Sequence, residues 1–256
     1  IAREKAGVIK QGVPVVAAFS GREVATVISR RCAEVAAPLT WVASGDRRRE
    51  LPGETAVFGP AAEAGKIAFE GLRWRREAWV PLPGLHQRLN TAVALATLER
   101  LSLLGWAIEE RAVERGLREM RWPGRMEWIG EVLLDCAHNA AAARCLAASL
   151  DRDDFCLIFG HLEDKPGREI VEPLLSRCRR LILTRPAGER AADPGILARE
   201  LGRGEVVEPV GRALARARSF PGPTLVTGSA HLVGQVRAEL LGRGAERDGL
   251  SDPGSR

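Results

Sequence analysis

The sequence predicts an α/β protein with two units, the second of which is a doubly wound α/β domain. Two observations support this class. Near the start of the chain, short apolar runs flank a helical stretch, and beyond residue 125 strand-like and helical stretches alternate regularly. Such alternation is typical of parallel sheets whose strands are joined by helices. We place the domain boundary at Pro123-Gly124, which is a strong helix breaker between the two regions.

The first unit begins with the pattern of a βαβ unit. The apolar run 13–19 predicts a buried strand, 21–36 predicts a helix, and 40–44 predicts the next strand. From 55 to 82 the chain alternates imperfectly, carries aromatic residues and is broken by Gly71, which predicts a β-hairpin or short meander. Two helices are expected to follow and to close this unit.

The first of these helices starts after the turn Pro83-Gly84, and the second covers about 107–119. A period of about 3.6 residues places several apolar side chains of the first helix on one side. These are Leu89, Val93, Leu95, Leu98 and Leu101. We expect this side to face the core.

In the second unit, strands and helices are expected in strict alternation. Strands are predicted at 126–135, 155–159, 180–184, 205–209 and 223–227, and helices at about 139–150, 167–178, 194–202, 211–218 and 229–241. This is the pattern of a doubly wound domain of about 120 residues, a common domain size. The polar, Gly-rich tail 244–256 is expected to be disordered.

Composition and charge exclude several classes of protein. The chain of 256 residues is 45% hydrophobic and 28% charged, which excludes disordered and collagen-like classes. No apolar run approaches the ~18 residues of a membrane span, and no secretory signal is visible. The net charge is +5 (38 − 33) and is spread over the whole chain rather than concentrated in a basic patch. We therefore expect no nucleic-acid partner. Five cysteines without a C-x-x-C pair argue against zinc or disulfides and for a cytoplasmic protein.

Polar side chains follow two of the predicted strands of the second unit. Asp135 ends an apolar strand, His138 and Asn139 lie in the turn, and Asn139 can cap the next helix. Ligands bind at the carboxyl ends of parallel strands, and helix N-termini favour anions such as phosphate. The alternative is that Asp135 and Asn139 only stabilise the turn. The strand ending at 159–160 is followed by a similar polar loop with Lys165.

No complete catalytic motif is present. The single Gly-Lys pair, Gly65-Lys66, is followed by Ile67 and lacks the first glycine of a P-loop. Neither H-E-x-x-H nor G-x-S-x-G occurs. From its residues alone, the chain therefore lacks a full set of catalytic groups.

Six motifs in order resemble the folylpolyglutamate synthase/dihydrofolate synthase family of the Mur ligase superfamily. They are IAREKAGVIKQGVPVV, LPGLHQRLNTAVAL, WPGRMEWI, LLDCAHNAAAA, FGHLEDK and VTGSAHLVGQVR. The resemblance implies that 1–121 is the C-terminal portion of a P-loop ATPase domain and that 122–243 is the Rossmann-like C-terminal domain. It also implies an N-terminally truncated chain, which begins at Ile1 rather than Met and whose P-loop lies upstream.

The implied reaction is ADP-forming ligation of L-glutamate to dihydropteroate, to folate, or to both. ATP converts the pterin-linked carboxylate into an acyl phosphate, and the amine of glutamate displaces phosphate. Mg²⁺ and cationic side chains stabilise the charge that develops in such transition states. Two Mg²⁺ sites are expected in the parent protein, a monomer with small-molecule substrates, whereas the truncated chain alone is expected to be inactive.

The resemblance also assigns roles to individual residues. Lys5 matches the lysine that CO₂ carbamylates to give a Mg²⁺ ligand, and the alternative is a solvent-facing helical lysine. Asn90 matches the residue at the adenine end of ATP, and the alternative is helix capping near its N-terminus. Arg125 matches the interdomain arginine that reaches the nucleotide. Asp135 is expected at the ribose and His138 at the phosphates, with His138 also counted as catalytic.

The chain departs from the family pattern in the loops of the second unit. The usual glycine and proline of D-G-A-H-N-P are Cys136 and Ala140, and D-K-D has become Asp164-Lys165-Pro166. Two other readings stay open: a Mur-type ligase acting on a peptide precursor, and a non-catalytic α/β nucleotide-binding module.

Overall fold

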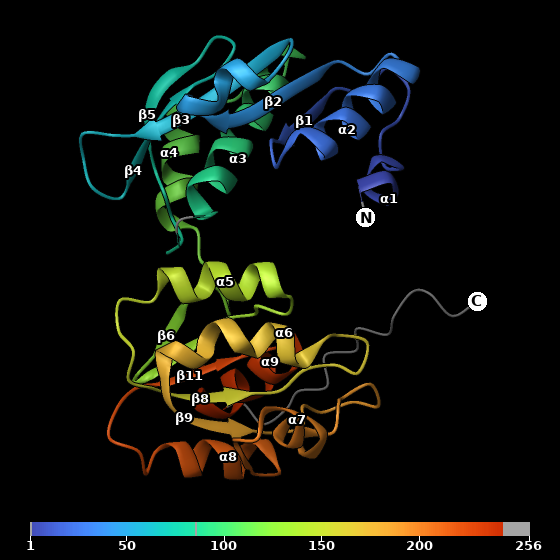
Figure 1. Cartoon of the computed structure of the whole chain (residues 1–256). Helices are drawn as coiled ribbons and strands as arrows, with labels where there is room; N and C mark the ends of the chain where they lie inside the picture. Colours follow the sequence, from blue (N-terminus) through green and yellow to red (C-terminus); the bar gives the residue numbers. More distant parts are fainter. Residues whose placement is uncertain (1, 85, 243–256) are drawn as a thin grey trace. The chain divides into compact units, whose positions relative to one another are not determined.

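The computed structural model describes residues 2–84 and 86–242, and the chain divides into two compact units, Ile1–Arg121 and Trp122–Arg256. Figure 1 shows the elements of each unit. The division precedes the Pro123-Gly124 turn by two residues. The tail expected over 244–256 lies outside the described residues. Within the described parts of the chain, none of the helices combines the length and apolar character that crossing a bilayer requires.

Unit 1 is built on one mixed five-stranded sheet. The strands are β1 (Val15–Ala18), β2 (Leu39–Ser44), β3 (Glu54–Pro60), β4 (Lys66–Glu70) and β5 (Arg75–Trp79), in that spatial order. The pairs β1–β2 and β2–β3 are parallel, whereas β3–β4 and β4–β5 are antiparallel. The predicted βαβ unit and meander are therefore both present, joined in one sheet.

The helices of unit 1 are α1 (Ala2–Ala6), α2 (Arg22–Glu34), α3 (His86–Leu103) and α4 (Glu110–Glu119), with the 3₁₀ helix η1 over Gly45–Glu50. Helix α3 packs against β1, β2, β3 and β4, α4 packs against β5, and α1 packs against α2. The side predicted for α3 faces the core, because Leu95 is buried and Leu89, Val93 and Leu98 pack against the same core while partly buried. Its buried residues are Gln87, Thr91, Ala92, Leu95, Ala96 and Glu99, while the other predicted leucines and Val93 are not fully buried.

The apolar pattern did not predict the buried polar side chains of α3, which have partners inside the unit. Glu99 is 1% exposed because its carboxylate accepts three backbone N–H groups from residues 72–74. Gln87 bonds to both of its polar neighbours on the same helix. A pattern of apolar residues alone cannot detect a buried polar residue whose partner comes from another element.

Unit 2 is a doubly wound sheet with strand order β10-β9-β8-β11-β7-β6. Its strands are β6 (Glu127–Ile129), β7 (Val132–Leu134), β8 (Phe155–Phe159), β9 (Cys178–Leu183), β10 (Glu205–Val206) and β11 (Thr224–Thr227). All neighbouring pairs are parallel except β6–β7. The single strand predicted over 126–135 is in fact a hairpin, because Gly130, with φ +58°, turns the chain between β6 and β7.

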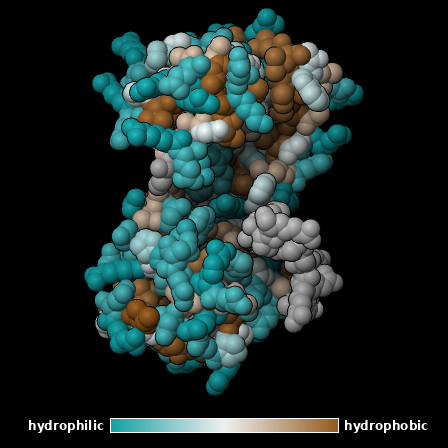
Figure 2. All heavy atoms as spheres, turned by 90° about the vertical axis from the view of Figure 1, so that its right-hand side faces the viewer, coloured by the Kyte–Doolittle hydropathy of each residue, from teal (hydrophilic) through white to brown (hydrophobic). Residues whose placement is uncertain are grey.

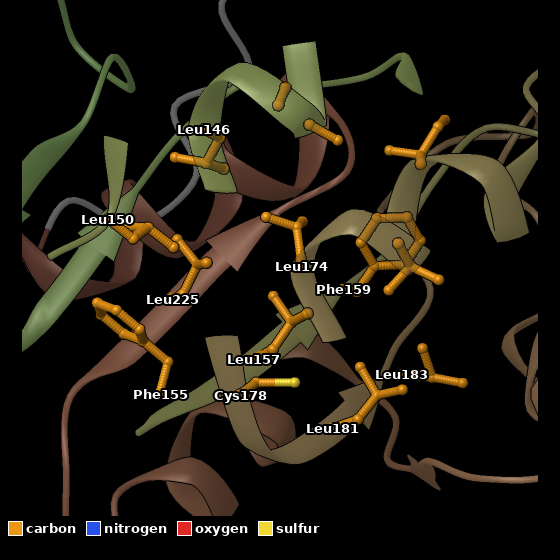
Figure 3. Packing of buried hydrophobic residues seen from close by; sticks show 14 of the residues in the cluster. Leu146, Leu150, Phe155, Leu157, Phe159, Leu174, Cys178, Leu181, Leu183 and Leu225 are labelled. Carbon is orange, nitrogen blue, oxygen red and sulfur yellow. The ribbon is translucent and has the colours of Figure 1, made fainter. Parts of the chain in front are cut away.

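Helices cover both faces of this sheet. The elements are α5 (Ala140–Ser149), α6 (Gly167–Val171), the 3₁₀ helix η2 (Glu172–Arg177), α7 (Pro194–Leu201), α8 (Val210–Ala217) and α9 (Ala230–Leu240). Neighbouring strand residues alternate between two cores, since Leu157 packs with α5, α6, η2 and α7, whereas Ile158 packs with α8 and α9. Figure 3 shows the first core, where Leu146, Leu174 and Leu225 approach one another from a helix, a 3₁₀ helix and a strand.

Each unit keeps its large apolar side chains mostly inside, and hydrophilic residues dominate the surface seen in Figure 2, although apolar patches show among them. The largest side chains that are at most 2% exposed include Trp41 of unit 1 and Phe155 and Phe159 of unit 2. All five cysteines are free in the structure.

Candidate functional site: a crevice at the strand ends of unit 2

The topology of unit 2 places a crevice at the carboxyl end of β11. Strand β11 lies between β7 and β8. The helices that follow β7 and β8 cover one face of the sheet, whereas α9, which follows β11, covers the other. Neighbouring strands whose connections leave toward opposite faces open the crevice in which doubly wound domains bind ligands.

Direct contacts join the three loops at these strand ends. The N–H of Gly228, after β11, donates to the carbonyl oxygen of Ala137, after β7, at 3.0 Å. The N–H of Gly160, after β8, donates to the carbonyl oxygen of Thr227 at 3.4 Å. Gly228 has φ +110°, and a Cβ there would lie 2.6 Å from the carbonyl oxygen of Gly160. Only glycine allows this close approach, so the loops after β7, β8 and β11 pack directly against one another at the base of the crevice.

Two helix N-termini open at this edge of the sheet. Asn139 is the N-cap of α5, where its Oδ1 accepts the N–H of Ala142 at 2.9 Å, which confirms the capping role predicted from the sequence. Ser229 is the N-cap of α9, and its Oγ accepts the N–H of Leu232 at 3.1 Å. Helix N-termini carry partial positive charge and unpaired N–H groups, so this edge favours an anionic ligand.

His138 lies in the loop between β7 and α5 and is exposed. Its Nδ1 lies 3.0 Å from the carbonyl oxygen of Cys136. A carbonyl oxygen only accepts hydrogen bonds, so Nδ1 carries the hydrogen and Nε2 remains the nitrogen that can act on a ligand. This arrangement fits the sequence-based expectation that His138 approaches phosphate groups, which stays a prediction.

Asp135 is 7% exposed and fixes the backbone around it. Its Oδ2 accepts the N–H of Met126 at 3.0 Å, and its Oδ1 accepts the N–H of Ala137 at 2.9 Å. The carboxylate thus ties the turn that carries Arg125 to the loop that carries His138. The predicted contact of Asp135 with a ribose stays a prediction.

The turn that carries Arg125 is also held from its other side. The N–H of Gly124 donates to Glu127 Oε2 at 2.8 Å, and both Glu127 oxygens lie 3.0–3.1 Å from Arg237 Nε of α9. The sequence motifs include Glu127 in the P-G-R-x-E segment but give no role to Glu127 or Arg237. No local signal could have paired them, because 110 residues separate the two in the chain.

Cys136, which stands where the family pattern has glycine, packs into this turn. A Cβ on Gly124 would lie 2.8 Å from Cys136 Sγ, and Gly124 has φ +69°. Burial raises the pKa of the Cys136 thiol, and the charge of Asp135 raises it further, although Arg125 opposes this effect. The thiol therefore stays protonated at neutral pH, and the Cys136 side chain packs in the turn rather than serving as a nucleophile.

A separate pocket of about 500 Å³ lies beside the ends of β8 and β9. Its lining includes His161, Lys165, Arg168, Asp193 and Glu200. The His161 ring stacks on Phe159 at 5.7 Å between centroids, and burial lowers the pKa of this histidine. Sequence reasoning singled out Lys165, which pairs with Asp164 at 2.9 Å, but gave no role to His161 or Glu200. The pocket thus combines cationic and anionic side chains at a ligand-binding edge of the sheet.

The other two predicted site residues belong to unit 1. Lys5 lies on α1 with 76% of its side chain exposed, 4.0 Å from the Glu4 carboxylate. Asn90 lies in the first turns of α3 and is exposed, and its Nδ2 donates to Gln87 Oε1 at 2.9 Å. Gln87 Nε2 in turn lies 3.0 Å from His86 Nε2, so the three residues of the H-Q-x-x-N motif form a chain of hydrogen bonds.

The structure therefore brings Arg125, Asp135 and His138 together within unit 2, and it places Lys5 and Asn90 on different helices of unit 1. Across residues 2–84 and 86–242, no group of three or more His, Cys, Asp or Glu side chains could hold a metal ion.

Comparison with known proteins relates this chain to one family. Residues 124–228 match the family model "Mur ligase, glutamate ligase domain". The chain is 30% identical over 254 residues to the "Probable bifunctional folylpolyglutamate synthase/dihydropteroate synthase" of Haloferax volcanii, covering 93% of this chain and 29% of that protein. It is 31% identical over 186 residues to the "Dihydrofolate synthase/folylpolyglutamate synthase" of Bacillus subtilis, covering 68% and 41%.

Solved structures give the same result. The Mycobacterium tuberculosis folylpolyglutamate synthase complexed with ADP and AMPPCP superposes with a TM-score of 0.79 at 25% identity, covering 93% of this chain and 58% of that one. The Escherichia coli FolC protein in complex with DHPP and ADP gives a TM-score of 0.77 at 26% identity, covering 94% and 56%. The chain thus spans well under two thirds of the length of each of these relatives.

Proposed function

The chain belongs to the folylpolyglutamate synthase/dihydrofolate synthase family of Mur ligases, and we therefore propose that the whole protein ligates L-glutamate to dihydropteroate, to folate, or to both. The observation that carries the proposal is the crevice at the end of β11. Two helix N-termini, the imidazole of His138 and the braced Arg125 turn meet there, which is an arrangement suited to a nucleotide.

The proposed reaction has two steps. A carboxylate oxygen of the pteridine substrate bonds to the γ-phosphorus of ATP, and ADP leaves. The amine nitrogen of glutamate then bonds to the acyl carbon, the bond from that carbon to the phosphate oxygen breaks, and the amine gives up a proton. Negative charge grows on the phosphoryl group and then on the tetrahedral intermediate, so cationic and N–H donor groups lower both barriers.

Each site residue has a proposed role in this scheme. Arg125 and His138 contact the phosphates, with Nε2 of His138 as the ligand-facing nitrogen, and Asp135 holds the ribose while it fixes both loops. Asn90 contacts the adenine end from α3. Lys5 carries a carbamate that would serve as one oxygen ligand for Mg²⁺. The remaining ligands would have to come from outside the described residues, so we route no step through the metal.

We propose the pocket beside β8 and β9 as the place for the amino-acid substrate. Its Lys165 and Arg168 can pair with carboxylates, and its Asp193 and Glu200 can attract an ammonium group. In the same proposal, residues 1–121 are the C-terminal portion of an ATPase domain, and residues 122–243 are the C-terminal ligase domain. The protein acts in the cytoplasm as a monomer.

The test is ATP-dependent incorporation of labelled glutamate by the whole protein, with ADP release measured in parallel. We expect Lys5→Ala to abolish incorporation without unfolding the protein, since its side chain is 76% exposed. Lys10→Ala, which removes another exposed lysine nearby, is the matched control and keeps activity. Normal turnover in Lys5→Ala would end the carbamate assignment, and a wild-type protein without incorporation would reject the function itself.

A further inference from the structure

Unit 1 contains an arginine-lined pocket that the proposed reaction does not use. It has a volume of about 300 Å³ and lies where the β4–β5 turn and β5 meet the start of α4. The residues that line it are Arg73, Trp74, Arg75, Arg76, Ile108 and Glu110. A hollow of this size is at the lower end of the range for small-molecule sites.

The backbone below the pocket is held rigidly. Glu99 of α3 accepts the N–H groups of Leu72 at 2.8 Å, Arg73 at 2.6 Å and Trp74 at 2.5 Å. Gly71 allows the Glu99 carboxylate to come this close to the backbone, because a Cβ at position 71 would lie 2.2 Å from a Glu99 oxygen. The side chains of Arg73 and Trp74 therefore project from a turn that is fixed before any ligand arrives, which lowers the entropy cost of binding.

Arg76 is the main indication that this pocket suits an anion. Only 11% of its side chain is exposed, and its ion pair is with Glu110 at 3.5 Å, a carboxylate that is itself 79% exposed. Its Nε is buried and has no hydrogen-bond partner among the described residues. A buried guanidinium group is costly unless its donors are satisfied, so this side chain can accommodate a further acceptor.

The pocket also carries an excess of positive charge. In the part of the chain that the structure describes, Arg73 makes no ion pair, and Arg75 shares Glu70 with Arg48. Helix α4 begins beside the pocket, and its N-cap residue Glu109 makes no side-chain capping bond, which leaves N–H groups at that end. The excess of arginine charge, the unpaired Nε of Arg76 and the N-terminus of α4 all favour an oxyanion as the ligand.

We propose that this pocket binds the carboxylates of a γ-linked glutamyl chain. Guanidinium groups pair with carboxylates in a planar, two-bond geometry, and the indole of Trp74 and the side chain of Ile108 suit the methylene groups between them. Glu110 can accept an amide N–H of the chain. The inference rests on the proposed function, because a folylpolyglutamate synthase lengthens such a chain.

The test is calorimetric titration of the protein with tri-γ-glutamate, a tripeptide of γ-linked glutamates. Loss of one charge-assisted pair is worth roughly ten- to a hundred-fold in Kd. We expect this weakening in Arg76→Gln and in Arg73→Gln, and circular dichroism confirms that each variant is folded. Arg73 is exposed, so its variant tests the site even if Arg76→Gln unfolds.

Arg111→Gln is the matched control, because Arg111 lies on α4, is 86% exposed, pairs with Glu109 and does not line the pocket. It should bind the tripeptide as the wild type does. Equal affinity in Arg73→Gln, Arg76→Gln and Arg111→Gln would overturn the proposal. So would inorganic phosphate or ATP binding as tightly as the tripeptide with the same dependence on Arg73 and Arg76. The titration needs no ligation, so its failure is separate from a failure of the glutamate-incorporation assay.

Discussion

Glu99 of α3 is predicted to be the most consequential single carboxylate in unit 1. It is 1% exposed and accepts three backbone N–H groups from the β4–β5 turn. Removing an acceptor leaves each partly buried donor unsatisfied, at about 1–3 kcal/mol per donor. Taking the low end for each of the three donors because water can replace part of the loss, Glu99→Ala should lower the free energy of unfolding by roughly 3 kcal/mol.

The assay is urea unfolding of the chain followed by tryptophan fluorescence, to which Trp74 of the same turn contributes together with tryptophans of both units. Glu99→Gln should cost less, about 1–3 kcal/mol, because its amide oxygen still accepts while its NH₂ group faces a donor. Glu114→Ala, an exposed carboxylate on α4, is the control and should stay within about 0.5 kcal/mol of wild type. If Glu99→Ala unfolded at the same urea concentration as Glu114→Ala, the three hydrogen bonds would contribute nothing to stability, and the reasoning would be refuted.

Three further predictions concern unit 2. His138→Ala should lower kcat for glutamate addition in the whole protein while leaving the fold intact, and an unchanged rate would reduce His138 to a turn residue. Arg237→Ala should weaken ADP binding, because it frees the Glu127 carboxylate that holds the turn of Arg125; calorimetry should show no such loss in Arg212→Ala on α8. Burial raises the pKa of Cys156 to about 11, so its contribution to stability is complete below about pH 9 and is lost as the pH rises toward 11. Urea midpoints across this range should fall less in Cys156→Ala, and parallel pH profiles in the two proteins would contradict the assignment.

The alternation of apolar stretches was sufficient to predict the doubly wound sheet of unit 2. Buried strands such as β8 are continuous apolar runs bounded by polar loops, and each is followed by a helix. The apolar pattern was insufficient to predict the secondary structure where one residue changes the backbone conformation. Gly130 turns 126–135 into a hairpin, and Pro173 lies within the 3₁₀ helix η2, where one continuous helix was expected over 167–178.

The residues of the candidate site also fall into two groups, those that the sequence predicts and those that it does not. Asp135, His138 and Asn139 are recognisable from the sequence because they follow directly after a buried strand. Glu127, Arg237 and His161 are not, because their roles come from contacts with residues far along the chain or from burial that no local pattern encodes. Motif resemblance supplied the roles of Lys5 and Asn90, and the structure adds only their exposure and their hydrogen bonds.

The two bracing carboxylates, Asp135 and Glu99, follow one principle at different places. Each accepts backbone N–H groups from a turn that carries an arginine: Asp135 holds the turn of Arg125, and Glu99 holds the turn of Arg73. A buried carboxylate is expensive unless its acceptors are used, so its presence under a turn indicates that the turn must keep one shape. In both places the turn of fixed shape carries an arginine, Arg125 in unit 2 and Arg73 in unit 1. An arginine on a turn of fixed shape loses little conformational entropy when it binds an anion, and both the proposed nucleotide site and the proposed glutamyl pocket depend on this property.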